Sequence, residues 1–266
     1  MSARLSHPAV ALVIAFLVAI SIGTGLLMLP VARAEAAAVP FITALFTATS
    51  AVCVTGLVLV DTGTYWSGFG QGVIMALFQL GGFGMMTSAT MLGLLVNRQL
   101  RLRSRLMLQA ETHSLALGDV RSVARLVLMV TIGVEGIAAL LLAGRFMVTY
   151  DMAWREALWQ GLFHAVSAFN NAGFSTWPDS VTRFASDGWV LGPLMIAVVI
   201  GGLGFPVLHE LIGMRQRRGV ASIHTTLTLW GSAALIAGGT LAFWWAEAHN
   251  PSTLGGMDAP QQWLAA

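Results

Sequence analysis

The sequence predicts an all-α polytopic membrane protein in which helix–pore loop–helix units are repeated. Three observations predict this fold class. The 266-residue chain is 56% hydrophobic and only 10% charged, with a mean hydropathy of +0.77, whereas about a quarter of the residues in soluble domains are charged. Several apolar stretches reach the roughly 20 residues that a helix needs to cross a bilayer. Two motifs also recur along the chain at nearly one spacing.

Five apolar stretches are predicted to be spanning helices. They are, in order, about Ala9–Leu29, Gly72–Val96, Val123–Met147, Trp189–Ile212 and Thr225–Ala246. The first stretch and the small residues of "VARAEA" after it also resemble a signal peptide, but its apolar part is longer than the roughly 7 to 15 residues of such peptides. The internal repeat pairs the first stretch with the third, so we predict a retained helix.

The arginines predict the orientation of these helices. All fourteen basic residues are arginine, and the net charge of +2 is too small to indicate a nucleic-acid partner. Ten arginines lie in connections that the positive-inside rule assigns to the cytoplasm: Arg4, Arg98, Arg101, Arg103, Arg105, Arg121, Arg125, Arg215, Arg217 and Arg218. The N-terminus is therefore predicted to be cytoplasmic. Cys53 is the single cysteine, so no disulfide forms within the chain.

An internal repeat relates two parts of the chain. "FTATSAVCVTGL" at Phe46–Leu57 aligns with "FHAVSAFNNAGF" at Phe163–Phe174, with identical residues at five positions and a spacing of 117. "QLGGFG" at Gln79–Gly84 aligns with "VIGGLG" at Val199–Gly204 at a spacing of 120. Two independent matches at nearly one spacing indicate a repeated structural unit.

Each unit is predicted to contain a spanning helix, a short apolar helix, a polar segment with glycine, and a second spanning helix. The short helices are about Pro40–Ala51 and Trp154–Phe169. If Phe41–Leu57 crossed the bilayer, Arg98–Arg105 would lie outside, against the positive-inside rule. We therefore predict that both short helices and their polar segments enter and leave on the outer side. Irregular backbone at membrane depth is tolerated only where protein or a water-filled cavity satisfies it.

The polar segments that follow the short helices are predicted to hold a cation. A helix that points its C-terminus inward places about half a negative charge there, and an extended backbone beyond it can replace the hydration shell of an ion with carbonyl oxygens. Glycine permits the positive φ that such a backbone needs, which explains Gly56 and Gly173. The alternative is a pair of glycine turns between packed helices, with Asn170 and Asn171 capping the helix end. The repetition favours pore loops.

The two motif pairs resemble a known family. "TATSAVCVTGL" followed by "FQLGGFG", then "FHAVSAFNNAGFS" followed by "IGGLGF", is similar to the Trk/Ktr/HKT superfamily of potassium transporters, in particular its TrkH- and KtrB-type ion-conducting subunits. The resemblance covers about residues 9 to 266. It implies a pseudo-fourfold cation channel of four units that takes up potassium across the cell membrane, with K⁺ as the transported ion and no other cofactor.

The resemblance also implies the ion-binding residues of the selectivity filter. Each filter segment centres on its glycine, and family members with serine at the first glycine tend towards sodium, so Gly56 favours potassium. The backbone carbonyls expected to bind K⁺ are those of Cys53, Val54, Thr55, Gly56, Asn170, Asn171, Ala172 and Gly173. The amide side chains of Asn170 and Asn171 are expected to brace the backbone from behind.

Partners and location follow from the same resemblance. It implies a homodimer of the full-length subunit, a cytosolic nucleotide-binding regulatory ring of the TrkA or KtrA type, and a multi-pass position in the inner (plasma) membrane. The arginine-rich connection from Arg98 to Arg125 is consistent with contact with that ring and with anionic lipid.

The predicted organisation has two complete units and the start of a third. The third unit stops within its short helix, so we expect the 266 residues to be a fragment with about two and a half of four units. The boundaries are 1–96 for the first unit, 97–120 for the cytoplasmic arginine-rich connection, 121–213 for the second unit, and 214–266 for the start of the third.

Several further residues leave alternatives open. The glycine clusters at Gly81–Gly84 and Gly201–Gly204 can be hinges, but small residues also let membrane helices pack closely, and we favour packing. Pro206 is predicted to kink the fourth span. Glu135, near the middle of the third span, is a candidate functional residue; the alternatives are that it is protonated or that it is hydrogen-bonded to a neighbouring helix. For His164 we favour a packing hydrogen bond over a proton relay.

Two other functional classes were weighed against a channel-like transporter. An alternating-access symporter also uses broken helices near the middle of the membrane, but the breaks here offer mainly backbone. A membrane-embedded enzyme is less favoured. "HELIG" at His209–Gly213 begins like a zinc-protease motif, but glycine stands where the second histidine is required. We therefore predict that the protein is not an enzyme.

Overall fold

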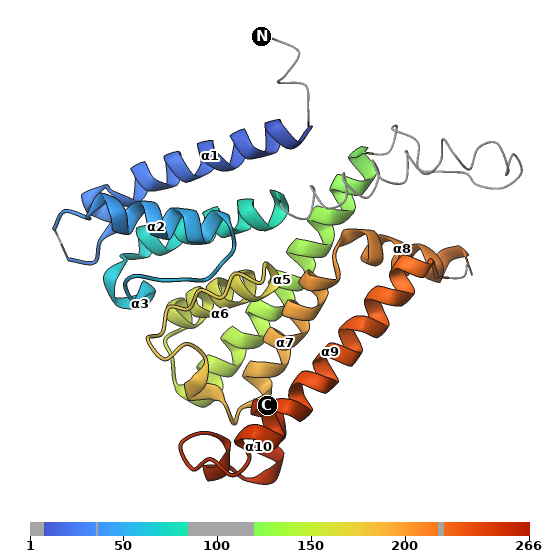
Figure 1. Ribbon diagram of the computed structural model, residues 1–266. Coiled ribbons are helices and arrows are strands. Elements are labelled where there is room, and N and C mark those ends of the chain that lie inside the picture. Colours follow the sequence, from blue (N-terminus) through green and yellow to red (C-terminus); the bar gives the residue numbers. More distant parts are fainter. Residues whose placement is uncertain (1–7, 36, 85–119, 218–220) are drawn as a thin grey trace, which may run out of the picture.

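The computed structural model describes residues 8–35, 37–84, 120–217 and 221–266, and these residues form helices and loops (Figure 1). Two helices in this part of the chain are long and apolar enough to cross a bilayer, Val127–Tyr150 and Ile223–Glu247. A bent pair of helices makes a third if it is counted as one span. The predicted fold class, an all-α polytopic membrane protein, is confirmed. Of the predicted arginine-rich connection, Arg98 to Arg105 lie outside the described residues.

The first group of helices, blue to teal in Figure 1, consists of α1 (Pro8–Leu27), α2 (Phe41–Val52), α3 (Thr62–Tyr65) and a helix described over residues 68–84. Their buried apolar side chains form one cluster, which includes Leu27, Trp66 and Phe78. The loop after α1 is bonded to the loop after α3, since the Ser67 amide donates to the Ala32 carbonyl at 2.9 Å. The segment that contains α2 therefore begins and ends at the same end of the group.

The second group consists of α5 (Val120–Tyr150), α6 (Trp154–Phe169) and α7 (Gly188–Leu203). The end of α5 is bonded to the start of α7, because Arg145 Nε donates to Asp187 Oδ2 at 2.8 Å and the Tyr150 hydroxyl donates to the same oxygen at 3.0 Å. The segment that contains α6 therefore also begins and ends at one end of its group. The predicted short helices correspond to α2 and α6, and α6 has the predicted bounds.

The two groups share a core. Phe163 and Val166 of α6 and Phe174 of the loop after it lie in the same buried cluster as Phe78. The rings of Phe78 and Phe163 meet edge to face with their centroids 5.6 Å apart, and Phe174 stacks on Phe78 at 5.9 Å. The second short helix is therefore packed against the first group, which brings the two polar segments together.

The predicted span Trp189–Ile212 is divided by a sharp bend, which lies two residues before the predicted kink at Pro206. Helix α7 ends at Leu203, and α8 (Phe205–Arg217) continues at an angle of 96° to it. The break is at Gly204, whose φ of 78° and ψ of 158° lie in a region that only glycine adopts readily. Pro206 lies in the first turn of α8, where a missing amide hydrogen is tolerated. The kink that we assigned to Pro206 is therefore located at Gly204.

The last helices follow the order of the earlier groups. Helix α9 (Ile223–Glu247) leads into the short η5 (Leu254–Gly256) and then into α10 (Ala259–Ala265). Large apolar side chains on α9 are exposed, for example Leu235 at 78% and Trp245 at 80%. These lengths match the predicted spanning helix Thr225–Ala246 and the start of another short helix.

The contacts of Asp187 predict a stability effect. Burial raises the pKa of this carboxyl, but hydrogen bonds from Arg145 and Tyr150 outweigh burial and hold the pKa below its ordinary value. The Asp187 carboxylate therefore stabilises the fold at pH values above its pKa in the unfolded protein, which is near 4. This stabilisation is lost as the pH falls through its lower pKa in the folded protein. We expect Asp187→Ala to lower the free energy of unfolding by about 1 to 3 kcal/mol, since it removes a helix cap and charged hydrogen bonds.

Thermal unfolding of the detergent-solubilised protein at neutral pH measures this effect. The matched control is Asp179→Ala, which removes an exposed carboxylate from the next ion pair along the chain. The account of Asp187 is contradicted if the two variants unfold at the same temperature.

Candidate functional site

The two polar segments leave their helices with the same hydrogen bonds. After α2, the amides of Val54 and Thr55 donate to Ala51 and Ser50 at 3.1 and 2.9 Å. After α6, the amides of Asn171 and Ala172 donate to the carbonyls of Ala168 and Ser167 at 3.0 and 2.8 Å. This pair of bonds is the Schellman motif, which satisfies the last carbonyls of a helix and turns the chain away from its axis.

One of the two residues that make these turns is unusual. In a Schellman motif the left-handed position usually carries glycine or asparagine. Here Val54 (φ 55°) and Asn171 (φ 56°) occupy it, and the glycines follow two residues later as Gly56 (φ 70°) and Gly173 (φ 71°). A left-handed valine costs about 1 to 3 kcal/mol and persists only where the surrounding structure enforces it. Each segment therefore has two positive φ angles, at matching positions.

The carbonyls of these segments are unpartnered. In the backbone hydrogen bonds of the two segments, the segment residues donate through their amides. No donor among the described residues bonds a backbone carbonyl of residues 53–56 or 170–173. Asn170 and Ala172 are buried, whereas the other six residues of the two segments are partly or fully exposed. The two segments therefore present eight carbonyl oxygens that are free to bind a cation or water.

The two segments lie next to each other at their glycines. A Cβ atom added to Gly56 would lie 2.6 Å from the Ala172 carbonyl oxygen and 3.2 Å from the Cα of Gly173. A Cβ atom added to Gly173 would lie 3.5 Å from the Cα of Gly56. All the predicted site residues are thus in two loops that meet at Gly56 and Gly173.

The glycine clusters pack against the ends of the short helices. A Cβ on Gly81 would collide with the carbonyl oxygen of Val52, the last residue of α2. A Cβ on Gly201 would collide with the carbonyl oxygen of Phe169, the last residue of α6. The packing interpretation is confirmed at these two positions, whereas Gly204 is a helix break.

The side chains of the two asparagines donate hydrogen bonds to protein groups. Asn170 Nδ2 lies 2.9 Å from the Val166 carbonyl, 2.6 Å from Gln79 Oε1 and 3.2 Å from Glu135 Oε1. Asn171 Nδ2 lies 3.3 Å from the Val198 carbonyl of α7. Glu135 is therefore hydrogen-bonded to a neighbouring helix and at the same time reaches a residue of the second loop.

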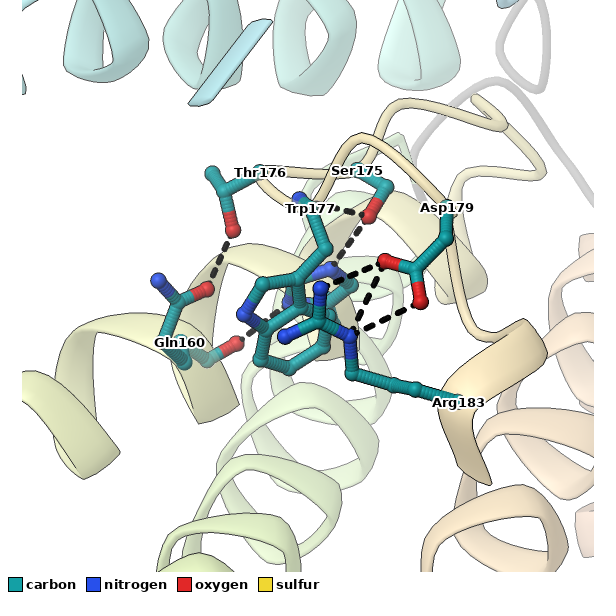
Figure 2. Close-up of polar contacts among 7 residues, drawn as sticks. Gln160, Ser175, Thr176, Trp177, Asp179 and Arg183 are labelled. Carbon is teal, nitrogen blue, oxygen red and sulfur yellow. Dashed lines mark hydrogen bonds and ion pairs between the residues drawn. The ribbon is translucent and has the colours of Figure 1, made fainter. Parts of the chain in front are cut away.

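Side chains contact the extended segment that follows Gly173 (Figure 2). His164 Nε2 lies 3.0 Å from Ser175 Oγ, and its ring stacks on Trp177 at a centroid distance of 4.1 Å. Thr176 donates to the side chain of Gln160. Since His164 also contacts the Gln160 carbonyl at 2.8 Å, both ring nitrogens have partners. The packing role that we favoured for His164 is confirmed.

An ion pair lies at the surface beside Trp177 of this segment. Arg183 lies 5.6 Å from the centroid of Trp177 and donates to both carboxylate oxygens of Asp179 (Figure 2). These hydrogen bonds lower the pKa of Asp179 and raise the pKa of Arg183. Both groups are therefore charged at neutral pH.

The residues of the rejected zinc motif have a structural role. Glu210 accepts hydrogen bonds from Ser222 and Thr225 and so fastens the start of α9 to α8. No group of three or more histidine, cysteine or acidic side chains that could hold a metal occurs among the described residues.

Sequence reasoning missed three features of the site. It did not find the left-handed conformation of Val54, for which the residue type gives no signal. It also missed Gln79 as the partner of Glu135 and Asn170, and Gly82 as the residue beside the Asn170 side chain. The "LGGFG" motif marked the neighbourhood, but only the packing of helices from both groups assembles these contacts.

The fold and the loops define a class, an all-α membrane protein with two matched, carbonyl-lined glycine loops. The family model described as TrkH, cation transport protein, matches residues 1–236. The chain belongs to this family.

Similar proteins in this family have been named for the ions that they take up. The chain is 40% identical to the Ktr system potassium uptake protein B of Bacillus subtilis over 95% of its own length and 55% of the relative. It is 36% identical to the protein of the same name from Vibrio alginolyticus, over 84% of its own length and 49% of the relative. It is 30% identical to the potassium/sodium uptake protein NtpJ of Enterococcus hirae, over 86% of its own length and 50% of the relative. The chain spans about half the length of these curated relatives.

Proposed function

We propose that the protein containing this chain takes up potassium across the cell membrane as a channel-like transporter subunit. The ion is selected by backbone carbonyls of Cys53, Val54, Thr55, Gly56, Asn170, Asn171, Ala172 and Gly173. The observation that carries this proposal is the set of unpartnered carbonyls in two adjacent loops of matching backbone. It is supported by the family and by relatives named for potassium uptake.

The chemistry of the loops suits a weakly hydrated cation. Helices α2 and α6 both end at a loop, so each contributes about half a negative charge to the site. The eight proposed ligands are all backbone carbonyls, which can replace the hydration shell of an ion without binding it too tightly to leave. Transport therefore needs no reacting side chain, which is why we propose a transporter and not an enzyme.

The organisation and partners form part of the proposal. The units are 1–96 and 121–213, joined by the cytoplasmic connection 97–120, with 214–266 as the start of a third unit of a pseudo-fourfold pore. The N-terminus is cytoplasmic in the inner (plasma) membrane. The relatives named as proteins of a Ktr system support a regulatory partner, and we propose a cytosolic nucleotide-binding ring of the TrkA or KtrA type, together with a homodimer of the intact subunit.

Flux measurements test the proposed function. The intact protein that carries this chain is reconstituted in lipid vesicles, and the entry of K⁺ and Na⁺ is measured with ion-sensitive dyes at matched gradients. We expect entry of K⁺ to exceed entry of Na⁺, together with single-channel currents in planar bilayers. Empty vesicles are the control.

Two outcomes contradict the proposal. Equal entry of both ions through the protein excludes the selective filter. Strictly coupled movement of K⁺ with a second ion, without resolvable currents, supports an alternating-access symporter instead.

A further inference from the structure

A buried polar network connects three helices directly behind the second loop. Its members are Gln79 from the helix described over 68–84, Glu135 from α5, and Asn170 at the end of α6. Glu135 is 8% exposed and Asn170 is 5% exposed. A charged or polar group at such a depth is costly unless it is paired and hydrogen-bonded, so this network is maintained against a substantial desolvation penalty.

The direction of each hydrogen bond in the network is fixed by one backbone carbonyl. The Val166 carbonyl only accepts, so the atom of Asn170 at 2.9 Å from it is the amide nitrogen. That nitrogen faces Gln79 at 2.6 Å, so Gln79 presents its oxygen to it. Gln79 must then turn its own amide nitrogen to Glu135, at 3.3 Å from Oε2.

Glu135 consequently accepts hydrogen bonds at both oxygens. Asn170 Nδ2 approaches Oε1 at 3.2 Å, and since this nitrogen has two hydrogens for three acceptors, one hydrogen is shared between two of them. Gln79 Nε2 approaches Oε2. Only a carboxylate accepts at both positions, since an amide at this place would turn its own hydrogens toward one of the two donors. The network therefore requires the particular side chain that the sequence has at position 135.

We propose that Glu135 is a positioning residue for the second filter segment. Through the Asn170 side chain it fixes the orientation of Asn170, the residue after α6 whose backbone carbonyl is a proposed K⁺ ligand, and through Gln79 it ties that residue to the first group of helices. This inference rests on the proposed function, because it assigns a residue to the selectivity of the same site.

The neighbouring glycine supports this role. A Cβ on Gly82 would overlap the Asn170 side-chain oxygen, whereas a Cβ on the equivalent Gly202 would lie 3.9 Å from the Asn171 amide nitrogen. The close approach at Gly82 confines the Asn170 amide from the side opposite its donor bonds. The positions of the first unit that are equivalent to Glu135 and Asn170 carry Val18 and Cys53, which offer no such acceptor and donor pair. In the described residues of the two units, this network is therefore found at the second loop and not at the equivalent positions of the first.

Selectivity measurements on variants of Glu135 test the proposal. In vesicles that contain the intact protein, Glu135→Leu removes both acceptors and is expected to lower the ratio of K⁺ to Na⁺ entry on the order of tenfold. Glu135→Gln preserves one acceptor, so its ratio should fall between those of Glu135→Leu and the unmodified protein. The ratio is independent of how much protein folds and inserts, which separates positioning from a purely structural role.

The controls keep the outcomes distinct. Thr131→Val changes a buried side chain one turn away on α5 whose hydroxyl has no partner among the described residues, and it should leave the ratio unchanged. If Glu135→Leu fails to insert into the membrane, Gly82→Ala and Gly202→Ala test the same proposal. We then expect a lower ratio of K⁺ to Na⁺ entry in Gly82→Ala than in Gly202→Ala. An unmodified protein without K⁺ preference overturns the proposed function itself. A normal ratio in Glu135→Leu or Gly82→Ala, in a protein that does prefer K⁺, overturns only the role of Glu135.

Discussion

Replacing Gly56 by serine is expected to abolish most of the discrimination between K⁺ and Na⁺. Two costs coincide at this position. The φ of 70° is strained for any residue with a side chain, and a Cβ atom would lie 2.6 Å from the Ala172 carbonyl oxygen. Since that oxygen is a proposed ligand of the second segment, the substitution disturbs both segments at once. We expect the K⁺ to Na⁺ permeability ratio to fall by at least about tenfold, equivalent to about 1.4 kcal/mol.

Gly173→Ser is the matched comparison for Gly56→Ser. Its φ of 71° imposes the same backbone strain, but its Cβ would meet only the Cα of Gly56 at 3.5 Å, an ordinary contact distance. We expect potassium selectivity to weaken, by a smaller factor than in Gly56→Ser. Unchanged permeability ratios in both variants would contradict the assignment of these segments as filters.

Gly201→Ala is expected to prevent most of the protein from folding in the membrane. The added methyl group would collide with the Phe169 carbonyl oxygen at the end of α6. A backbone atom cannot move aside as a flexible side chain can. Overpacking usually lowers the free energy of unfolding by about 1 to 3 kcal/mol, and we expect a loss at or above the upper end of this range. Fluorescence size-exclusion chromatography of the solubilised protein would measure the loss as a reduced monodisperse fraction.

Gly192→Ala on the same helix provides the control for Gly201→Ala. A Cβ at Gly192 meets nothing within 4 Å, and alanine is the better helix former by about 1 kcal/mol. We expect normal amounts of folded Gly192→Ala. Equal yields of the two variants would show that α7 does not pack against the end of α6 as described.

Much of the architecture was predictable because it depends on local patterns. Apolar length predicts the spanning helices, and the bounds of α6 follow from the polar and glycine residues that end it. The repeat predicted that both loops have one conformation, and Val54 and Asn171 do have matching φ angles. These features follow from composition and periodicity, which a sequence displays directly.

The features that could not be predicted depend on packing between distant segments. Glycine permits the helix break at Gly204 but does not cause it by itself, because Gly84 at the equivalent position of the first unit is helical. The network of Gln79, Glu135 and Asn170 forms only when three helices meet. An isolated glutamate in an apolar stretch marks a candidate, but its partners come from the tertiary structure.

The position of a bound ion tests the central claim most directly, that backbone carbonyls of the two glycine loops bind the transported cation. Crystals of the intact protein grown with Rb⁺, a K⁺ substitute, give anomalous scattering that locates the ion. The account predicts a peak between the loops, coordinated by carbonyl oxygens of residues 53–56 and 170–173. A peak bound instead by carboxylates such as Glu135, with none between the loops, would contradict it.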